Sequence, residues 1–175
     1  MTKKIVQRED DVLREQAKEI PLSEITTPKI QKILKEMSAS LKSQDDGVAI
    51  AAPQIGYSLQ IFVVAGKMFS ESFIRGEALP KDAEVPKDLI FINPKISKLS
   101  RDKEWLPEGC LSVRWLYGKI LRSKKATVTA YDENGKKFTR GASGLLAQVF
   151  QHETDHLKGV LFIDKAKHIK EELPR

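Results

Sequence analysis

The stretch GASGLLAQVFQHETDHLKG, residues 141–159, has the spacing of one amphipathic helix that begins near Ser143. Within it, His152 and His156 are four residues apart, so they project from one helix face within reach of a single metal ion. Glu153 lies roughly 100° from His152 around the helix axis, where a base can take a proton from metal-bound water. We predict that this helix carries a metal site and that the rest of the fold packs around it.

A catalytic tetrahedral site needs a third protein ligand. In one known arrangement the motif continues as HExxHxxGxxH. This chain has the glycine, Gly159, which also ends the helix, but it has Phe162 where the last histidine would be. Only residues 157–175 follow the motif, which leaves little room for a separate helix bearing a carboxylate ligand. The third ligand is therefore expected upstream. A thiolate is the strongest candidate, and Cys110 is the single cysteine, although a lone cysteine is often only a small buried apolar side chain.

The first half of the chain predicts one helix and two buried strands. Apolar residues recur at spacings of three and four from Ile30 to Leu41, with Thr27 as the cap and Pro28 at the first helical position. The apolar runs at 59–65 and 89–92 are typical of buried strands. We expect a long polar surface loop at 67–88, between the two strands.

The second half predicts a hairpin before the histidine helix and a short helix after it. Residues 126–140 are rich in strand formers around Asn134-Gly135, a pair that favours a type I′ turn. Residues 164–175 have room only for a short helix, in which His168 is expected to be solvated. The prediction is an α+β fold with mixed or antiparallel strands packed around the metal-binding HExxH helix, an N-terminal helix and a short C-terminal helix.

Composition limits where the protein acts. With one cysteine no intrachain disulfide can form, and the segment MTKKIVQREDD has no apolar core of a secretory signal, so a cytoplasmic location is expected. The uncharged run at 47–66 is interrupted by Pro53 and polar residues, which disfavours a membrane span. The net charge of +6 is scattered, so we expect weak surface attraction to RNA or the ribosome and no specific DNA binding. We predict a single domain over residues 1–175.

Three stretches together resemble the peptide deformylases. GVAIAAPQ at 47–54 is similar to their glycine-rich turn ending in glutamine, EGCLS at 108–112 to their cysteine motif, and QHETDHLKGVLF at 151–162 to their metal helix. HExxH alone is moderately specific, whereas the three motifs in this order are strongly specific. The resemblance extends weakly over nearly the whole chain.

The resemblance implies a metal-dependent hydrolase of protein biosynthesis and N-terminal processing. Cys110, His152 and His156 would bind one divalent ion with water as fourth ligand, most commonly Fe2+ in the family and in some members Zn2+ or another ion. The implied substrate is the N-formyl-methionine start of a nascent polypeptide, which is hydrolysed to formate and a free amino terminus.

The resemblance also implies roles for further residues. Glu153 would accept the proton of the attacking water and pass it to the departing amine, while Gln54 and the backbone N–H of Leu111 would donate to the developing oxyanion. Residues implied in substrate binding are Val48, Ala49, Glu108 and Val149. For Val149, one helical turn before His152, core packing is an equally good interpretation.

Three positions depart from the family pattern. Ala49 stands where a second glycine is usual, and Arg114 follows Val113 where a proline is usual. Tyr117 lies near the position of an arginine that contacts the bound peptide, so Arg114 or Arg122 is a candidate to compensate. The departures concern peptide binding, not metal chemistry.

Two alternatives to deformylation remain open. One is a related metallohydrolase that acts on a different acylated amine or peptide, which the three departures would suit. The other is a catalytically silent, metal-stabilised module that binds a ribosome or a peptide. Glu153 and Gln54 argue against the silent module, because a purely structural metal site needs neither and usually has four protein ligands.

Overall fold

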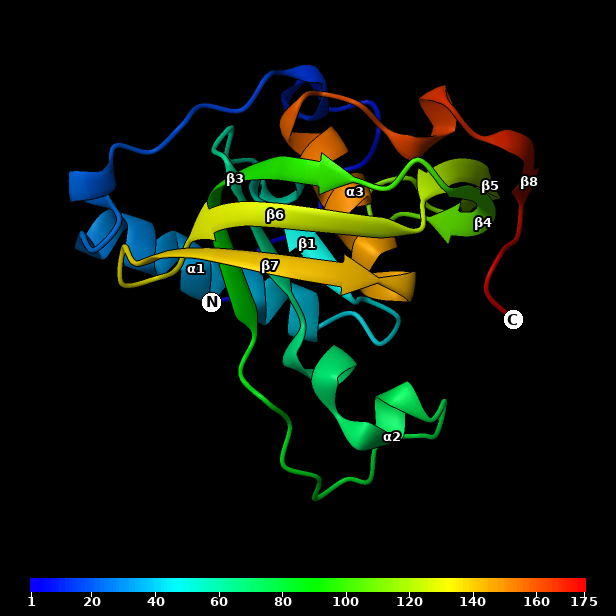
Figure 1. Cartoon of the computed structure of the whole chain (residues 1–175), viewed down its shortest axis with the longest axis horizontal. Coiled ribbons are helices and arrows are strands. Elements are labelled where there is room, and N and C mark those ends of the chain that lie inside the picture. Colours follow the sequence, from blue (N-terminus) through cyan, green and yellow to red (C-terminus); the bar gives the residue numbers. More distant parts are fainter.

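Strand β2, Ile61–Val64, is fully buried and alternates its side chains between two apolar cores. Its first and third residues belong to the cluster built on helix α1, Pro28–Lys42, and its second and fourth to the cluster built on helix α3, Gly144–Leu157. Because successive side chains of a strand point to opposite faces, the sheet containing β2 is covered by a helix on each face. In the computed structural model of the chain (Figure 1), α3 lies behind the front strands, near the centre of the molecule.

This sheet has five antiparallel strands in the order β1-β2-β3-β6-β7. The other four strands are β1 (Ala49–Ala51), β3 (Leu89–Leu99), β6 (Lys125–Tyr131) and β7 (Lys137–Ser143). The predicted strands at 59–65 and 89–92 are both confirmed. Strand β3 extends seven residues further than predicted, to Leu99, because β6 pairs with its outer half, which is polar and carries no run of apolar residues.

A second, three-stranded sheet has the order β4-β5-β8 and lies on the right in Figure 1, to one side of α3. It consists of β4 (Lys103–Gly109), β5 (Leu116–Ser123) and β8 (Lys167–Glu171). The predicted C-terminal helix is therefore wrong: the segment is an edge strand paired with β5, and His168 is exposed on it as expected. A helix this short has little stability of its own, whereas the open edge of β5 offers backbone partners.

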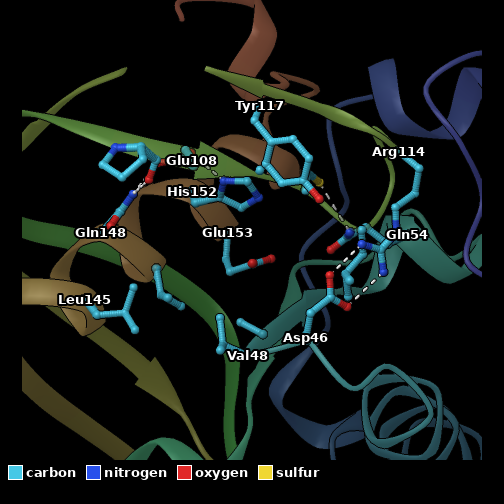
Figure 2. Close-up of a pocket in the computed structure, with 17 residues that line it drawn as sticks. Asp46, Val48, Gln54, Glu108, Arg114, Tyr117, Leu145, Gln148, His152 and Glu153 are labelled. Atoms are coloured by element: carbon cyan, nitrogen blue, oxygen red, sulfur yellow. Dashed lines mark hydrogen bonds and ion pairs between the residues drawn. The ribbon is translucent and has the colours of Figure 1, made fainter. Parts of the chain in front are cut away.

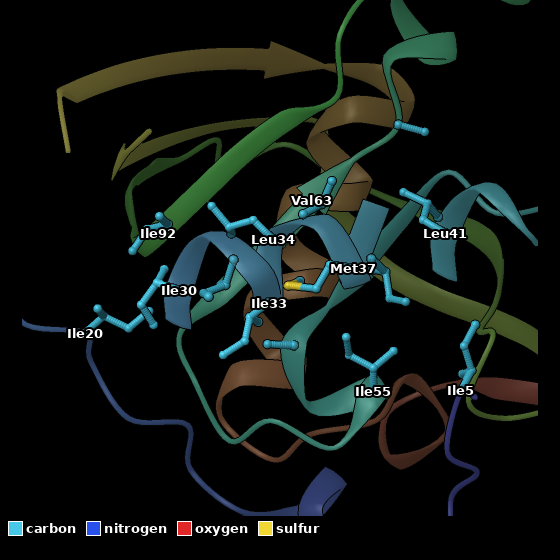
Figure 3. Close-up of a cluster of buried hydrophobic side chains, with 14 of the residues drawn as sticks. Ile5, Ile20, Ile30, Ile33, Leu34, Met37, Leu41, Ile55, Val63 and Ile92 are labelled. Atoms are coloured by element: carbon cyan, nitrogen blue, oxygen red, sulfur yellow. The ribbon is translucent and has the colours of Figure 1, made fainter. Parts of the chain in front are cut away.

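The predicted N-terminal helix is confirmed as α1, with Pro28 at its first turn. Thr27 occupies the cap position, but its hydroxyl donates to the backbone oxygen of Glu24 at 2.7 Å instead of capping the helix. Figure 3 shows the apolar face of α1 directed at the sheet, with Met37 fully buried in the middle of the cluster.

The predicted hairpin is formed by β6 and β7, but its turn is not type I′. That turn requires positive φ at both central residues, and only Gly135 has it, at 80°. Instead the N–H of Gly135 donates to the oxygen of Asp132 at 3.0 Å, and the Asp132 carboxylate accepts the N–H groups of Asn134 and Lys136, both at 2.9 Å. This side-chain acceptor stabilises a three-residue loop.

The 67–88 segment is partly helical, because it contains the short helix α2, Glu71–Ile74, whose cap Ser70 accepts the N–H of Phe73 at 3.3 Å. A 3-10 helix, Gly66–Phe69, precedes α2, and the residues after α2 run to β3 without further helix or strand (Figure 1). None of the helices has the length and apolar character needed to cross a membrane.

Candidate active site

The fold brings the three predicted ligands together. His152 and His156 lie on α3 as predicted, and Cys110 directly follows β4. The ligand atoms of the three side chains lie within 4.8 Å of one another, and Cys110 Sγ is 3.3 Å from His156 Nε2. Tetrahedral coordination with ordinary metal–sulfur and metal–nitrogen bonds requires separations of about 3.3–3.6 Å. The Cys110–His156 separation already meets this requirement, so the cluster is a candidate site for a metal ion.

Glu108 fixes the orientation of His152. Its carboxylate is 2.5 Å from His152 Nδ1, and it accepts from Arg122 Nη2 at 2.6 Å and Nε at 3.2 Å. Burial opposes the charge on Glu108, but the hydrogen bonds with His152 and Arg122 outweigh burial and lower the pKa of Glu108 to about 2. An ionised carboxylate at Nδ1 keeps the proton there, so Nε2 of His152 is the atom available to a metal.

The two histidines respond differently to the site. Burial lowers the pKa of His156 well below its ordinary value, so its imidazole is neutral, as a metal ligand must be. Burial also opposes a charge on His152, but the neighbouring Cys110 and Glu108 prevail and raise the pKa of His152 well above its ordinary value. The environment around His152 therefore favours a positive charge, which a proton or a metal ion supplies.

Glu153 is buried next to this cluster, with 3% of its surface exposed. Its Oε2 atom has no hydrogen-bond partner in the protein. Burial is the main cause that raises the pKa of Glu153 to about 7; the positive charge of His152 opposes this rise, and the negative charge of Glu108 adds to it. A buried carboxyl group that exchanges its proton near neutral pH, with an unpaired oxygen, is suited to proton transfer.

Gln54 is held rigidly beside Cys110. Its Oε1 accepts the backbone N–H of Ala51 at 2.8 Å, and its Nε2 donates to Ser112 Oγ at 3.1 Å and lies 3.7 Å from Cys110 Sγ. The backbone N–H of Leu111 donates to no acceptor in the protein. The N–H of Leu111 is thus available as a donor, and Gln54, whose Nε2 also donates weakly to Cys110 Sγ, lines the same cavity.

These groups line a cavity of about 430 Å³. Val48, Ala49, Glu108 and Val149, the predicted substrate contacts, all line it, as does Leu145. Figure 2 shows Val48 and Leu145 below Glu153, which gives this end of the cavity an apolar wall. Both carboxylate oxygens of Glu108 accept hydrogen bonds from within the protein, one of them from Gln148 Nε2 at 3.0 Å.

The departures from the family pattern have structural outcomes. Ala49 lies in β1 without positive φ, so its strand conformation does not require a glycine. Arg122 is buried and paired with Glu108 and with Asp155, at 2.7 Å, so its guanidinium is not free to contact a peptide. Arg114 and Tyr117, by contrast, both line the cavity.

Several supporting residues were not predicted from the sequence. Ser112, Gln148 and Asp155 orient predicted site residues, and Asp46 lines the cavity and pairs with Arg114. Ser112 and Asp155 lie inside the motifs EGCLS and QHETDHLKGVLF, and this position could have indicated that they support the site. Asp46 offered none, because its partner lies 68 residues away.

A buried carboxyl group beside a Cys/His/His cluster, at the wall of a cavity, is an arrangement typical of metal-dependent hydrolases. The chain belongs to the polypeptide deformylase family, whose family model matches residues 2–172. Peptide deformylase 2 of Clostridium acetobutylicum is 40% identical over 156 residues, which cover 89% of each protein.

Solved structures of this family share the fold. A peptide deformylase of Synechococcus elongatus in complex with actinonin has a TM-score of 0.76 and 35% identity, covering 94% of this chain and 78% of that one. A class I type b peptide deformylase of Acinetobacter baumannii bound to Met-Ala-Ser has a TM-score of 0.80 and 27% identity, covering 94% of this chain and 98% of that one.

Proposed function

We propose that Cys110, His152 and His156 bind one divalent metal ion, and that Glu153, Gln54 and Leu111 act on an N-formyl peptide bound beside it. As a member of the polypeptide deformylase family, the chain is an enzyme that removes the N-formyl group from nascent polypeptides. The observation that carries the residue assignment is the unpaired, buried carboxyl of Glu153 next to the three clustered ligand atoms.

The donor set fits a divalent cation. Two imidazoles and a thiolate suit both ferrous iron and zinc, and we propose Fe2+, the ion that deformylases commonly use, with Zn2+ or another divalent ion as a substitute. When bound, the ion supplies positive charge that lowers the pKa of a coordinated water and polarises the formyl carbonyl.

The chain's own residues would then move one proton and stabilise one charge. Glu153, with a pKa of about 7, takes the proton of the attacking water and returns it to the nitrogen of the departing amine. Negative charge develops on the formyl oxygen, where the N–H of Leu111 donates a hydrogen bond together with the Nε2–H of Gln54 that otherwise donates to Cys110 Sγ. One such donor typically accounts for a factor of about 10²–10³ in rate.

The apolar end of the cavity would take the side chain of the first residue. Val48, Leu145 and Val149 form a wall without charge, which suits the unbranched thioether of methionine. The Acinetobacter baumannii relative was solved with Met-Ala-Ser, a peptide that begins with this residue. The cavity has room for one such side chain and adjoining backbone.

Release of formate from formyl-Met-Ala-Ser tests the proposal, with protein purified anaerobically and loaded with ferrous iron. We expect turnover by the wild type and loss of turnover in Glu153→Gln with the metal content unchanged. A Glu153→Gln protein that retains metal and wild-type turnover would refute the assigned base. Acetyl-Met-Ala-Ser, tested alongside, distinguishes deformylation from hydrolysis of a different acylated amine.

Three broader proposals accompany this function. The whole chain, residues 1–175, would form one catalytic domain, acting in the cytoplasm and associating weakly with ribosomes. The scattered net charge of +6 supports only a weak electrostatic attraction to RNA. Cosedimentation with ribosomes at low and high salt measures it.

A further inference from the structure

An ion pair joins the two walls of the active-site cavity. Asp46 precedes β1 on one wall, and Arg114 follows the cysteine motif on the other. The pair is bidentate, with Arg114 Nη1 2.6 Å and Nη2 3.0 Å from the two oxygens of Asp46, and Nη2 also donates to Gln44 Oε1 at 3.1 Å. Figure 2 shows the pair beside the cavity, with dashed lines marking its bonds.

The pair lies where the substrate chain must leave the site. Leu145 and Val48 line the apolar end that would take the first side chain, and in Figure 2 Arg114 and Asp46 lie on the opposite side of Glu153 from Leu145. A peptide whose first residue occupies the apolar end therefore passes the ion pair with its next residues.

The two charges are unequally accessible. The Arg114 side chain is 17% exposed and that of Asp46 is 57% exposed. Paired, they present almost no net charge to the cavity, whereas either alone would present a full charge. The hydrogen bond from Arg114 lowers the pKa of Asp46, so the pair stays ionised at neutral pH.

We propose that Asp46 and Arg114 are a specificity-determining pair that masks two opposite charges, so that the cavity accepts acidic and basic residues after formyl-methionine alike. This inference rests on the proposed function, because it assigns the same cavity to a formyl-methionyl peptide. An enzyme that processes many different nascent chains needs such indifference to the second residue.

Single substitutions should unmask one charge at a time. Asp46→Asn leaves Arg114 cationic, so peptides with an acidic second residue should bind more tightly than they bind to the wild type. Arg114→Gln leaves Asp46 anionic, so peptides with a basic second residue should bind more tightly than they bind to the wild type. A partly exposed charge pair corresponds to a change of about three- to five-fold, which should shrink at high salt.

The experiment measures the affinity of metal-loaded protein for two amidated product peptides, Met-Glu-Ser and Met-Lys-Ser, by calorimetry. We expect wild type to bind both within about twofold, and the two variants to shift the Glu-to-Lys ratio of Kd in opposite directions by about three- to five-fold. The kcat/KM for the two formylated peptides should shift likewise, through KM with kcat nearly unchanged.

Asp164→Asn is the matched control. Asp164 accepts from Arg14 in another bidentate pair, at 2.6 and 3.1 Å, and neither residue lines the cavity. This variant should keep the wild-type peptide ratio. Thermal unfolding of all variants checks that they are folded.

Two results would overturn the inference: equal changes for both peptides, which would mean that the pair only holds the walls together, or no change at all. If the two variants shift the Glu-to-Lys ratio of Kd in opposite directions but no formyl peptide is hydrolysed, the proposed function fails and the specificity pair stands. If wild type binds neither product peptide and both variants keep the wild-type kcat/KM ratio for the two formylated peptides, the specificity pair fails and the formate assay alone decides the proposed function.

Discussion

Replacing Glu108 by glutamine removes the acceptor that holds His152 and Arg122 together. The Glu108 side chain is 5% exposed, and its oxygens accept from Arg122 at 2.6 and 3.2 Å and contact His152 at 2.5 Å. Glutamine has nearly the same shape but no charge, and its amide group faces the donors. Arg122, also 5% exposed, would keep its ion pair with Asp155 at 2.7 Å but lose the carboxylate charge and one of the two acceptors at position 108.

Two independent arguments give a similar loss of unfolding free energy for Glu108→Gln. Lowering the pKa of Glu108 from 4.5 to about 2 corresponds to about 3 kcal/mol of stability at pH 7. Removing one partner of a buried ion pair costs about 3–5 kcal/mol in other proteins. We therefore expect Glu108→Gln to lower the free energy of unfolding by about 3 kcal/mol, which is a Tm decrease of about 6–12 °C for a chain of this size.

The dependence on pH has a definite sign. Because the folded pKa of Glu108 is lowered, its contribution is complete above about pH 4.5 and is lost as the pH falls towards about 2. The difference in unfolding free energy between wild type and Glu108→Gln should therefore be smaller at pH 3 than at pH 7 by about 2 kcal/mol.

The assay is urea unfolding of both proteins in the metal-free state, with a chelator present, so that loss of a bound ion does not contribute. Asp164→Asn, which breaks an ion pair with side chains 45% and 34% exposed, should cost less than about 1 kcal/mol. A loss below about 1 kcal/mol for Glu108→Gln at pH 7, or a difference that does not change with pH, would refute the reasoning.

Three other predictions concern the oxyanion donor, the metal and the core. Ser112→Ala removes the acceptor that orients Gln54, so kcat in the formate assay should fall about 10-fold with metal content unchanged. Adding a chelator should lower the Tm of the wild type measured by calorimetry, because metal binds only the folded cluster, whereas Cys110→Ala should show little such shift. Met37→Ala should cost about 2–5 kcal/mol in urea unfolding and leave kcat unchanged, because Met37 is fully buried in the α1 cluster, on the sheet face opposite α3.

Elements that depend on near neighbours were predictable from local patterns of residues. The spacing of His152 and His156 predicts a shared helix face wherever the helix lies, because each turn is closed by hydrogen bonds four residues apart. The same argument predicted α1, whereas the start of β3 was predicted from a short run of apolar residues. Cys110 was predicted as a ligand from the absence of a downstream candidate and from the family resemblance, and the fold brings its Sγ to 3.3 Å from His156 Nε2.

Contacts between distant segments decided the rest. The C-terminal segment is a strand only because β5 offers it an open edge, and β4 and β5 pair although neither has the apolar alternation of a buried strand. Glu108 and Arg122, 14 residues apart, are carried by paired strands, and His152 reaches them from α3.

The sequence by itself therefore determined the chemistry-bearing helix, the predicted ligand types and the family. Only the tertiary structure decided what each charged group faces: Arg122 is fully occupied by Glu108 and Asp155, whereas Arg114 lines the cavity with Asp46. The physical reason is that helix periodicity is fixed by bonds within a few residues. The partner of a charge, in contrast, is set by where the folded chain brings residues 14 to 68 positions apart.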